Sequence, residues 1–249
     1  MDTTVAKGMA VMEVLAKAGG PIRLSAIAQR LDLQMSNVHR LLNTLIELGY
    51  AAQEAETGRY LPTPKLWELG VGIITAHPAK RAAAPYMQDL HRHTGETVSL
   101  TVLDGDEVLY LDKLTSPRPL RFTTQPGSRA PAALTASGKA MLARLPDPAP
   151  VLEATIRKGP EAKTLAVQAL LAEFQDILRS GYATSVSSWT AGIVSIAAAI
   201  PTPGAPHAAL SVSGPAERFT EAKRHEIVEA MLHTCARIAE TAGPPSGLR

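Results

Sequence analysis

Several kinds of residue and segment are scarce in this sequence. Its 249 residues include a single cysteine, Cys235, so no internal disulfide is possible and a reducing cytoplasm is the expected location. No run of about 18 apolar residues occurs and the N-terminus has no signal-peptide pattern, so we expect no contact with a membrane. Aromatic residues make up 4% of the chain, but apolar residues make up 45%, which is enough for ordinary globular cores.

Residues 24–50 carry the most informative local pattern, which predicts two helices joined by a tight turn. Ser25 is placed to cap the first helix, and residues 32–33 end it. Ser36 is placed to cap the second helix, and Gly49 stops it. The first helix has an apolar face made by Leu24, Ile27, Ala28 and Leu31. The second has a buried stripe made by Val38, Leu41, Leu42, Leu45 and Leu48.

The opposite face of the second helix is rich in hydrogen-bonding side chains and has no acid before Glu47. A helix that reads the DNA major groove needs such a face, because its polar side chains touch base edges and phosphates while the apolar stripe fixes its angle. A helical hairpin with a solvated polar face is the plainer alternative. The polar face consists of Gln34, Asn37, His39, Arg40, Asn43 and Thr44.

The residues on either side complete a winged helix-turn-helix over residues 1–63. Residues 50–53 and 59–61 flank a polar turn that ends in Gly58, which predicts a hairpin directly after the second helix. Arg59 in this wing is well placed to meet a phosphate. Upstream, a first helix ending at residues 19–21 is expected to add core side chains from Val5, Met9, Met12, Val14 and Leu15.

The charge of the chain is nearly balanced. Lys and Arg total 25 and Asp and Glu total 23, for a net charge of +2, and residues 1–63 hold six of each kind. This is weak electrostatics for a protein that binds a polyanion. We therefore expect specific contacts to double-stranded DNA, doubled by a second copy of the chain, rather than affinity from charge alone.

Residues 64–77 are expected to form a linker helix. Pro64 suits the first turn of a new helix, and the pair at 77–78 breaks it. Trp67 on this linker either packs on its own domain or is buried against a second subunit, and we favour the subunit contact. The other apolar positions of this helix are Leu66, Leu69, Val71 and Ile73.

A second domain is expected over residues 78–243, and the tail 244–249 is expected to be disordered. A helix over 79–93 ends at Gly95. The alternation of apolar and polar residues that follows predicts two strands joined as a hairpin up to residue 114. Further strands are expected at 121–123, 193–200 and 208–212, and helices at 135–145, 163–179 and 219–242. The last helix has Ile227, Met231, Cys235 and Ile238 as its core stripe. The fold class is therefore α+β.

Small polar residues in this second domain suggest a ligand pocket. Ser137 and Gly138 begin a helix, where free N–H groups and the helix dipole attract an anion. Ser195, Ser211 and Ser213 interrupt apolar strands, and the last two share one face. The alternative is that these serines only pack small and satisfy backbone groups.

In order along the chain, these motifs resemble the IclR family of bacterial transcription regulators over nearly its whole length. In the first half the resemblance rests on Ser36 with residues 38–42, on 48–50 and on 58–61. In the second half it rests on residues 95–98, 127–131, 136–140, 181–183, 192–197 and 210–215. The resemblance implies an N-terminal winged helix, a linker helix used in dimerisation and a C-terminal GAF-like α/β effector-binding domain. It also implies a homodimer or homotetramer on an inverted-repeat operator, controlled by a small-molecule effector.

The resemblance also assigns the residues of the effector pocket. Pocket positions of the family match Ala136, Ser137, Ser185, Ile193, Ser195, Ser211 and Ser213, and Gly138 is included with the helix start. Phe122 and Ala130 are expected to supply apolar wall. The family usually has an acidic run after the pair at 181–182; here there is none, and Trp189 adds bulk at the pocket mouth. We therefore expect an effector with a carboxylate or amide on an apolar or aromatic body.

Enzyme motifs have little support. Residues 137–140 lack the first glycine of a phosphate loop, and Ala140 replaces its metal-binding hydroxyl. There is no Gly-x-Ser-x-Gly elbow, and His91 and His93 lack other metal ligands nearby. We predict no catalytic residue, metal or cofactor. Two hypotheses remain: a ligand-responsive DNA-binding regulator, or a metabolite-binding protein or enzyme with a degenerate helix-turn-helix.

Overall fold

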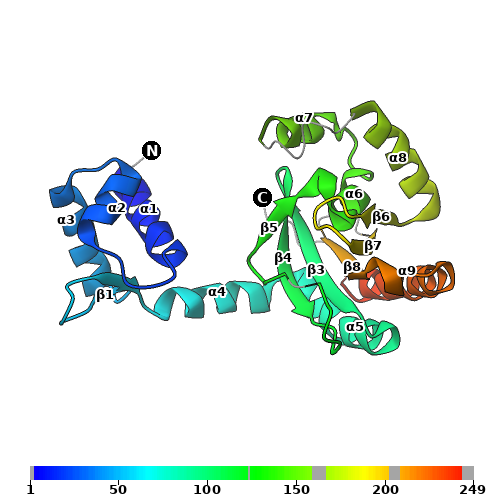
Figure 1. The fold of residues 1–249 in the computed structure, drawn as a ribbon, viewed down its shortest axis with the longest axis horizontal. Helices are drawn as coiled ribbons and strands as arrows, with labels where there is room; N and C mark the ends of the chain where they lie inside the picture. Colours follow the sequence, from blue (N-terminus) through cyan, green and yellow to red (C-terminus); the bar gives the residue numbers. More distant parts are fainter. Residues whose placement is uncertain (1–2, 123, 159–166, 202–207, 243–249) are drawn as a thin grey trace. The chain divides into compact units, whose positions relative to one another are not determined.

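The computed structural model describes residues 3–122, 124–158, 167–201 and 208–242. The chain divides into two compact units, Met1–Thr75 and Ala76–Arg249 (Figure 1). The tail predicted to be disordered, and residue 123 and the first residues of the helix predicted at 163–179, lie outside the described residues.

The first unit is a three-helix core followed by a hairpin. Its helices are α1 (Thr3–Lys17), α2 (Leu24–Leu31) and α3 (Met35–Glu47). The strands β1 (Ala51–Gln53) and β2 (Tyr60–Pro62) pair antiparallel, and an isolated bridge from Ile22 to Tyr60 ties the hairpin to the turn after α1. The helix-turn-helix and the wing predicted from the sequence are therefore present. Their shared core includes Val11, Leu15, Ile27, Val38 and Leu42, all almost completely buried.

The helix caps predicted in this unit are wrong. Ser25 and Ser36 lie inside the first turns of α2 and α3, whose N-caps are Arg23 and Gln34 without a side-chain capping bond. The predicted C-terminal ends of both helices are confirmed. Asp32 adopts the left-handed conformation after α2, and Gly49, with φ of 77°, follows α3. A glycine is favoured there because its missing Cβ removes the steric penalty of positive φ.

Three apolar side chains predicted for the core of this unit are exposed instead. Val5 and Met9 lie in the first two turns of α1 with 64% and 56% of their surface exposed, and Leu48, the C-cap residue of α3, has 53% exposed. The helical period places them on or beside the buried stripe, but the buried residues of α1 begin only at Val11 and those of α3 end at Leu42.

Helix α4 (Lys65–Ala76) follows the hairpin and belongs to the first unit. It has no buried residue, although its sequence is mostly apolar. Trp67 and Ile73 are 70% and 69% exposed, and Leu69 and Val71 are also exposed. Trp67 therefore does not pack on its own unit. Of the two alternatives that the sequence left open, contact with a second subunit remains.

The second unit contains a six-stranded antiparallel sheet in the order β5-β4-β3-β8-β7-β6. The hairpin β3 (Thr97–Asp104) and β4 (Glu107–Leu114) forms as predicted. The central strand β8 (Ala208–Pro215) lies between β3 and β7 (Ile193–Ala199). The edges are β5 (Arg129–Pro131) and β6 (Ala183–Val186).

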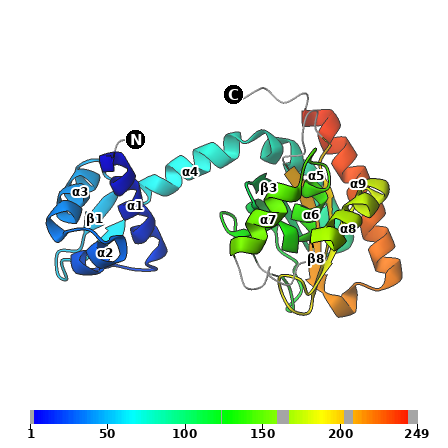
Figure 2. The same ribbon diagram turned by 90° about the horizontal axis from the view of Figure 1, so that it is seen from above.

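Helices cover both faces of this sheet (Figures 1 and 2). One face packs on α5 (Pro78–Thr94) and α9 (Glu221–Ala242), and the other on α6 (Ala136–Leu142), with α7 (Ala149–Lys158) and α8 (Val167–Ser180) beyond it. The predicted stripe of α9 is confirmed, since Ile227, Met231, Cys235 and Ile238 are all buried. The fold is the predicted α+β class.

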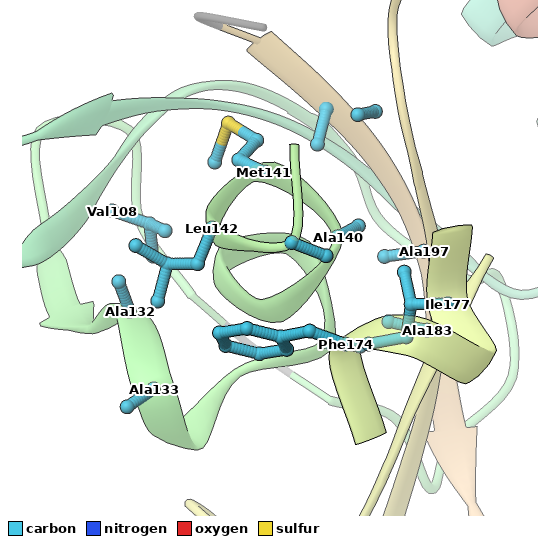
Figure 3. Close-up of a cluster of buried hydrophobic side chains, with 14 of the residues drawn as sticks. Val108, Ala132, Ala133, Ala140, Met141, Leu142, Phe174, Ile177, Ala183 and Ala197 are labelled. Atoms are coloured by element: carbon cyan, nitrogen blue, oxygen red, sulfur yellow. The ribbon is translucent and has the colours of Figure 1, made fainter. Parts of the chain in front are cut away.

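The two faces of the sheet differ in side-chain size. Because directly paired residues share a face, the registers place Val98, Leu100, Leu210, Val212 and Ile196 towards α5 and α9. Apart from Ile193 and Pro215 at the ends of their strands, the face towards α6 carries small residues on β6, β7 and β8. They are Ala183, Ser185, Ser195, Ala197, Ala199, Ala209, Ser211 and Ser213. Figure 3 shows α6 seated above Ala183 and Ala197, with Phe174 and Ile177 of α8 beside it. Small side chains let this short helix approach the sheet closely.

Some element predictions in this unit are wrong. Arg121 and Phe122 are not in a strand, and β5, β6 and α7 were not predicted. The two missed strands are short edge strands, whose three or four residues are too few to show alternation. Within the described residues, no helix is both long and apolar enough to span a membrane.

Candidate functional site

The polar face of α3 is open to solvent. Gln34, Ser36, His39, Arg40 and Asn43 are exposed, and Asn37 is half-buried. The opposite stripe of the same helix is fixed by Val38, Leu41 and Leu42 in the core. The helix therefore presents its polar side chains from a rigidly packed base, which is the arrangement a major-groove reader needs.

The other predicted DNA contacts lie in the same unit. Ser25 is exposed on α2, and Arg59 is half-buried at the start of the returning strand of the wing. The wing turn is held by Thr57, whose hydroxyl accepts the Arg59 N–H at 3.2 Å, and by the Gln53 amide, which donates to the Gly58 carbonyl at 3.0 Å. Neither Arg40 nor Arg59 forms an ion pair with a described residue, so both guanidinium groups are available to phosphate or base acceptors.

The second unit contains a cavity between the sheet and the start of α6. Nine of the eleven residues predicted for an effector pocket line it. They are Phe122, Ala136, Ser137, Ser185, Trp189, Ile193, Ser195, Ser211 and Ser213. The cavity leaves about 20 Å³ free, which is room for a single water molecule. A ligand with several heavy atoms must therefore displace part of the lining.

Two residues predicted for the pocket do not line it. Ala130 on β5 is buried in the hydrophobic core against α6 and α8. Gly138 donates its N–H to the Thr135 hydroxyl at 3.1 Å, so it is not free to bind an anion. Its α-carbon also faces Ala132, because a Cβ at this position would lie 2.5 Å from the Ala132 carbonyl carbon. Glycine is needed there for the close packing of α6 against Ala132.

Hydroxyl groups form a row across four strands on the α6 side of the sheet. Ser185 pairs in register with Ser195, Ser195 with Ser213, and Ser213 with Thr97. The hydroxyls of Ser195 and Ser213 are 2.8 Å apart, and Ser185 donates to the Leu134 carbonyl at 3.3 Å. Such a row offers donors and acceptors at regular spacing along one wall of the cavity.

Sequence reasoning missed three polar residues that line this cavity and a fourth on the strand beside it. Tyr110, Thr135 and Thr190 line the cavity. Ser99 pairs in register with Ser211, and its buried hydroxyl has no hydrogen-bond partner in the described part of the chain. A buried orphan hydroxyl is costly and is normally satisfied by a water molecule or ligand. Only the alternation of Ser99 with apolar neighbours could have signalled it.

The electrostatics of the cavity favour a neutral or anionic guest. Burial raises the pKa of the Tyr110 hydroxyl to about 12, so it stays a protonated phenol that can donate a hydrogen bond. Ala136 and Ser137 are the first residues of α6, so the positive end of that helix dipole meets the cavity. No carboxylate of the described residues lines the cavity.

Trp189 and Thr190 lie on the turn between β6 and β7. Ser187 in this turn has φ of 52°, an uncommon conformation for a residue other than glycine. Its N–H donates to the Ile193 carbonyl at 2.9 Å, and its hydroxyl accepts from Gly192 at 3.1 Å. Trp189 is 41% exposed, so the indole covers the cavity with one side in solvent.

The two neighbouring histidines and the cysteine contact other groups of the protein and do not form a reactive site. His91 Nδ1 lies 2.8 Å from the Glu96 carbonyl oxygen, and His93 lies 3.3 Å from Glu226. Among the described residues, no group of three possible metal ligands occurs. Burial raises the pKa of the Cys235 thiol to about 12, which keeps it protonated and unreactive.

Comparison with known proteins agrees with this division of the chain. Residues 4–55 match the IclR helix-turn-helix domain, and residues 71–240 match the C-terminal domain of the bacterial transcriptional regulator IclR. The HTH-type transcriptional regulator KdgR of Escherichia coli strain K12 is 36% identical over 220 residues, which cover 87% of this chain and 83% of KdgR.

Solved structures share the fold. The Thermotoga maritima IclR structure matches with a TM-score of 0.76 and 27% identity, covering 98% of this chain and 100% of that one. An IclR homologue from Microbacterium hydrocarbonoxydans in complex with 4-hydroxybenzoate matches with a TM-score of 0.81 and 24% identity, covering 96% and 98%.

A DNA-binding helix-turn-helix joined to a cavity-bearing α/β domain defines a class of transcriptional regulator. Within that class, the chain belongs to the IclR family of bacterial transcription regulators.

Proposed function

We propose that this regulator binds a two-fold symmetric operator as a dimer, or as a dimer of dimers. A small organic acid raises or lowers its affinity for the operator. The acid, or a related amide, binds the cavity of the second unit through a carboxylate on an apolar or aromatic body. The regulated genes form a catabolic operon for that compound.

The exposed polar face of α3 supports operator binding. An arginine, a histidine and two asparagines project from a helix whose other side is locked in the core. Arg pairs with guanine and Asn with adenine in the major groove, so this side-chain set can read sequence directly. A degenerate helix-turn-helix that no longer binds DNA would not need Asn37, His39, Arg40 and Asn43 together.

The exposed apolar surface of α4 supports the dimer. A helix that is apolar on most of its circumference is expected to be buried, yet this one buries no residue within one chain. Covering Trp67 and Ile73 with the same helix of a second chain would remove this surface from water. Two readers would then be held at a fixed separation, as half-sites on DNA require.

The hydroxyl row supports an acid as effector. A carboxylate can accept from Ser195, Ser213 and the Tyr110 phenol while meeting the start of α6. Phe122, Ile193 and Trp189 offer apolar contacts to the body of the ligand. The Microbacterium protein, which shares this fold, binds 4-hydroxybenzoate, an acid of this kind.

The size of the cavity suggests how binding is converted to a change in DNA affinity. Because about 20 Å³ admits only water, the effector must select an arrangement in which the turn carrying Trp189 has moved outward. The effector shifts the population by its differential affinity for the two arrangements. The chain runs directly from α4 into α5, so a change in the second unit reaches the linker helix.

Gel-shift assays with DNA flanking the gene of this protein test the proposal. We expect a shift that depends on salt and is altered by one member of a panel of aliphatic and aromatic acids. Failure to shift any fragment at low salt, with or without ligand, would instead favour a metabolite-binding protein or enzyme with a degenerate helix-turn-helix.

A further inference from the structure

A basic groove adjoins the serine-lined cavity. It has a volume of about 560 Å³, and Lys113, Arg121 and Thr124 are among its lining residues. Tyr110 and Trp189 line both the groove and the cavity, so the two spaces meet at these aromatic side chains. Among the residues that the structure describes, none that lines the groove is acidic.

The neighbouring carboxylates are already paired with other cations. Arg129 at the rim of the groove binds Asp104 at 2.5 Å and Glu107 at 3.5 Å. Asp112, the neighbour of Lys113 in sequence, binds Lys80 at 3.3 Å. These acids therefore do not neutralise the other two basic side chains of the groove.

In the described part of the chain, the side chains of Lys113 and Arg121 donate to neutral carbonyl groups. The Lys113 ammonium donates to the carbonyl of Thr124, and Arg121 donates to the carbonyl of Arg118 at 3.3 Å. No carboxylate of the described residues lies within ion-pair distance of either side chain. Two positive charges thus line one groove without a counter-charge, an arrangement that attracts an anion.

Thr124 adds an unsatisfied hydrogen-bonding group to the same groove. Its hydroxyl is buried, and the described part of the structure provides it with no partner. An oxyanion held by Lys113 and Arg121 could accept this hydroxyl hydrogen, which would remove the cost of leaving it unpaired.

We infer that the effector carries two acidic groups, one bound in the serine-lined cavity and the other, a carboxylate, phosphate or sulfonate, bound in the groove by Lys113 and Arg121. The inference rests on the proposed function, because it extends the same site. Tyr110 and Trp189 contact the part of the ligand between its two acidic ends.

Calorimetric titration of the full chain with matched pairs of acids tests this. The pairs are benzoate with terephthalate, butyrate with glutarate, and glycerate with 3-phosphoglycerate. Because the second acidic group gains charge-assisted hydrogen bonds in the groove, we expect the better-fitting two-acid compound to bind about tenfold tighter than its one-acid partner.

Charge-removing variants locate the second group. Lys113→Met and Arg121→Gln should each reduce this preference by about threefold to tenfold and leave the affinity for the one-acid partner nearly unchanged. Arg144→Gln, which removes an exposed charge elsewhere in the same unit, is the control and should change neither affinity. Thermal unfolding checks that the variants remain folded.

Three results would overturn the inference. Equal affinity for both members of every pair, unaffected by Lys113→Met, would reject the second subsite and leave the proposed acid effector intact. Inorganic phosphate that binds through Lys113 together with, and not in competition with, a two-acid compound would show an independent anion site. Absence of binding by every acid would reject the proposed function as well.

Discussion

The two units of this chain place their functional side chains in opposite environments. In the first unit the predicted DNA contacts lie on the outside of one 13-residue helix, α3, with the wing beside it. In the second unit most candidate ligand contacts are buried or half-buried, and they come from strands, turns and a helix that are far apart in sequence. The DNA-contact site depends mainly on the spacing of residues along one helix. The ligand site exists only after the sheet has brought distant segments together.

This difference has an energetic consequence. Exposed polar side chains on α3 can be replaced with little effect on folding, because they contact mainly solvent. The groups around the cavity are also parts of the core, so changes there alter both ligand binding and stability. A substitution on the polar face of α3 should therefore change DNA binding and leave the free energy of unfolding nearly unchanged. A substitution around the cavity should change both ligand binding and the free energy of unfolding.

The largest expected effect comes from adding one methyl group at two glycines, one in each unit. In Gly138→Ala the new Cβ would collide with the backbone of Ala132, so we expect the free energy of unfolding to fall by about 3 kcal/mol or more. In Gly8→Ala, on α1, the Cβ meets nothing within 4 Å, so we expect a gain of up to about 1 kcal/mol from helix propensity. Chemical denaturation followed by circular dichroism measures both, and equal stability of the two variants would contradict the close approach of α6 to Ala132.

The next effect is the loss of an arginine from the reading face. We expect Arg40→Ala to weaken operator binding about 10-fold to 100-fold, since a base-contacting arginine contributes about 1–3 kcal/mol. Effector binding and unfolding should not change. Fluorescence anisotropy with operator DNA gives the affinity, and Lys17→Ala on α1 removes the same charge from an exposed position as the control. Normal binding by Arg40→Ala would exclude this face as the reader.

The linker helix gives a third comparison, between exposed apolar and exposed polar positions of α4. We expect Trp67→Ser to raise the dimer dissociation constant about 30-fold, because a tryptophan at the centre of an interface contributes about 2 kcal/mol or more. Glu68→Gln, its exposed neighbour, should leave the constant unchanged. Sedimentation velocity measures the assembly, and an unchanged constant for Trp67→Ser would place the dimer contact elsewhere.

The smallest effect is expected inside the cavity. Ser213→Ala removes one hydroxyl of the Ser195–Ser213 pair, so the affinity for the acid should fall about fivefold, corresponding to about 1 kcal/mol. Operator binding without ligand should be unchanged. Ser180→Ala, at an exposed position of α8, is the control for calorimetry. If Ser213→Ala bound the acid as tightly as the unchanged protein, the hydroxyl row would have only a packing role.

The first unit was largely predictable because its signals are local. The helical periods of α2 and α3, the glycine after α3 and the turn of the wing each occupy a few consecutive residues. Several errors are at helix ends: Ser25 and Ser36 each lie two residues after the true N-cap, and Leu48 lies just beyond the end of α3. A periodic pattern does not say where a neighbouring helix stops covering it.

In the second unit the buried strands were predictable, but the full lining of the cavity was not. Family resemblance located Ser195, Ser211 and Ser213, while Tyr110 and Thr190 carry no local signal that points to a cavity. Their position depends on the β-bulge between β3 and β4 and on the turn after β6. Gly138 was placed in the pocket because a glycine at a helix start suits both anion binding and close packing, and only the structure distinguishes them.

The unequal faces of the sheet have an evolutionary consequence. Large aliphatic side chains hold the sheet to α5 and α9, while alanines and serines line the side towards α6. Exchange of one small residue for another on the α6 side alters the hydrogen bonding and shape of the cavity and leaves the large aliphatic contacts on the opposite face in place. A duplicated gene can therefore change the ligand that the cavity accepts through a few such exchanges while it keeps the inherited scaffold and its helix-turn-helix.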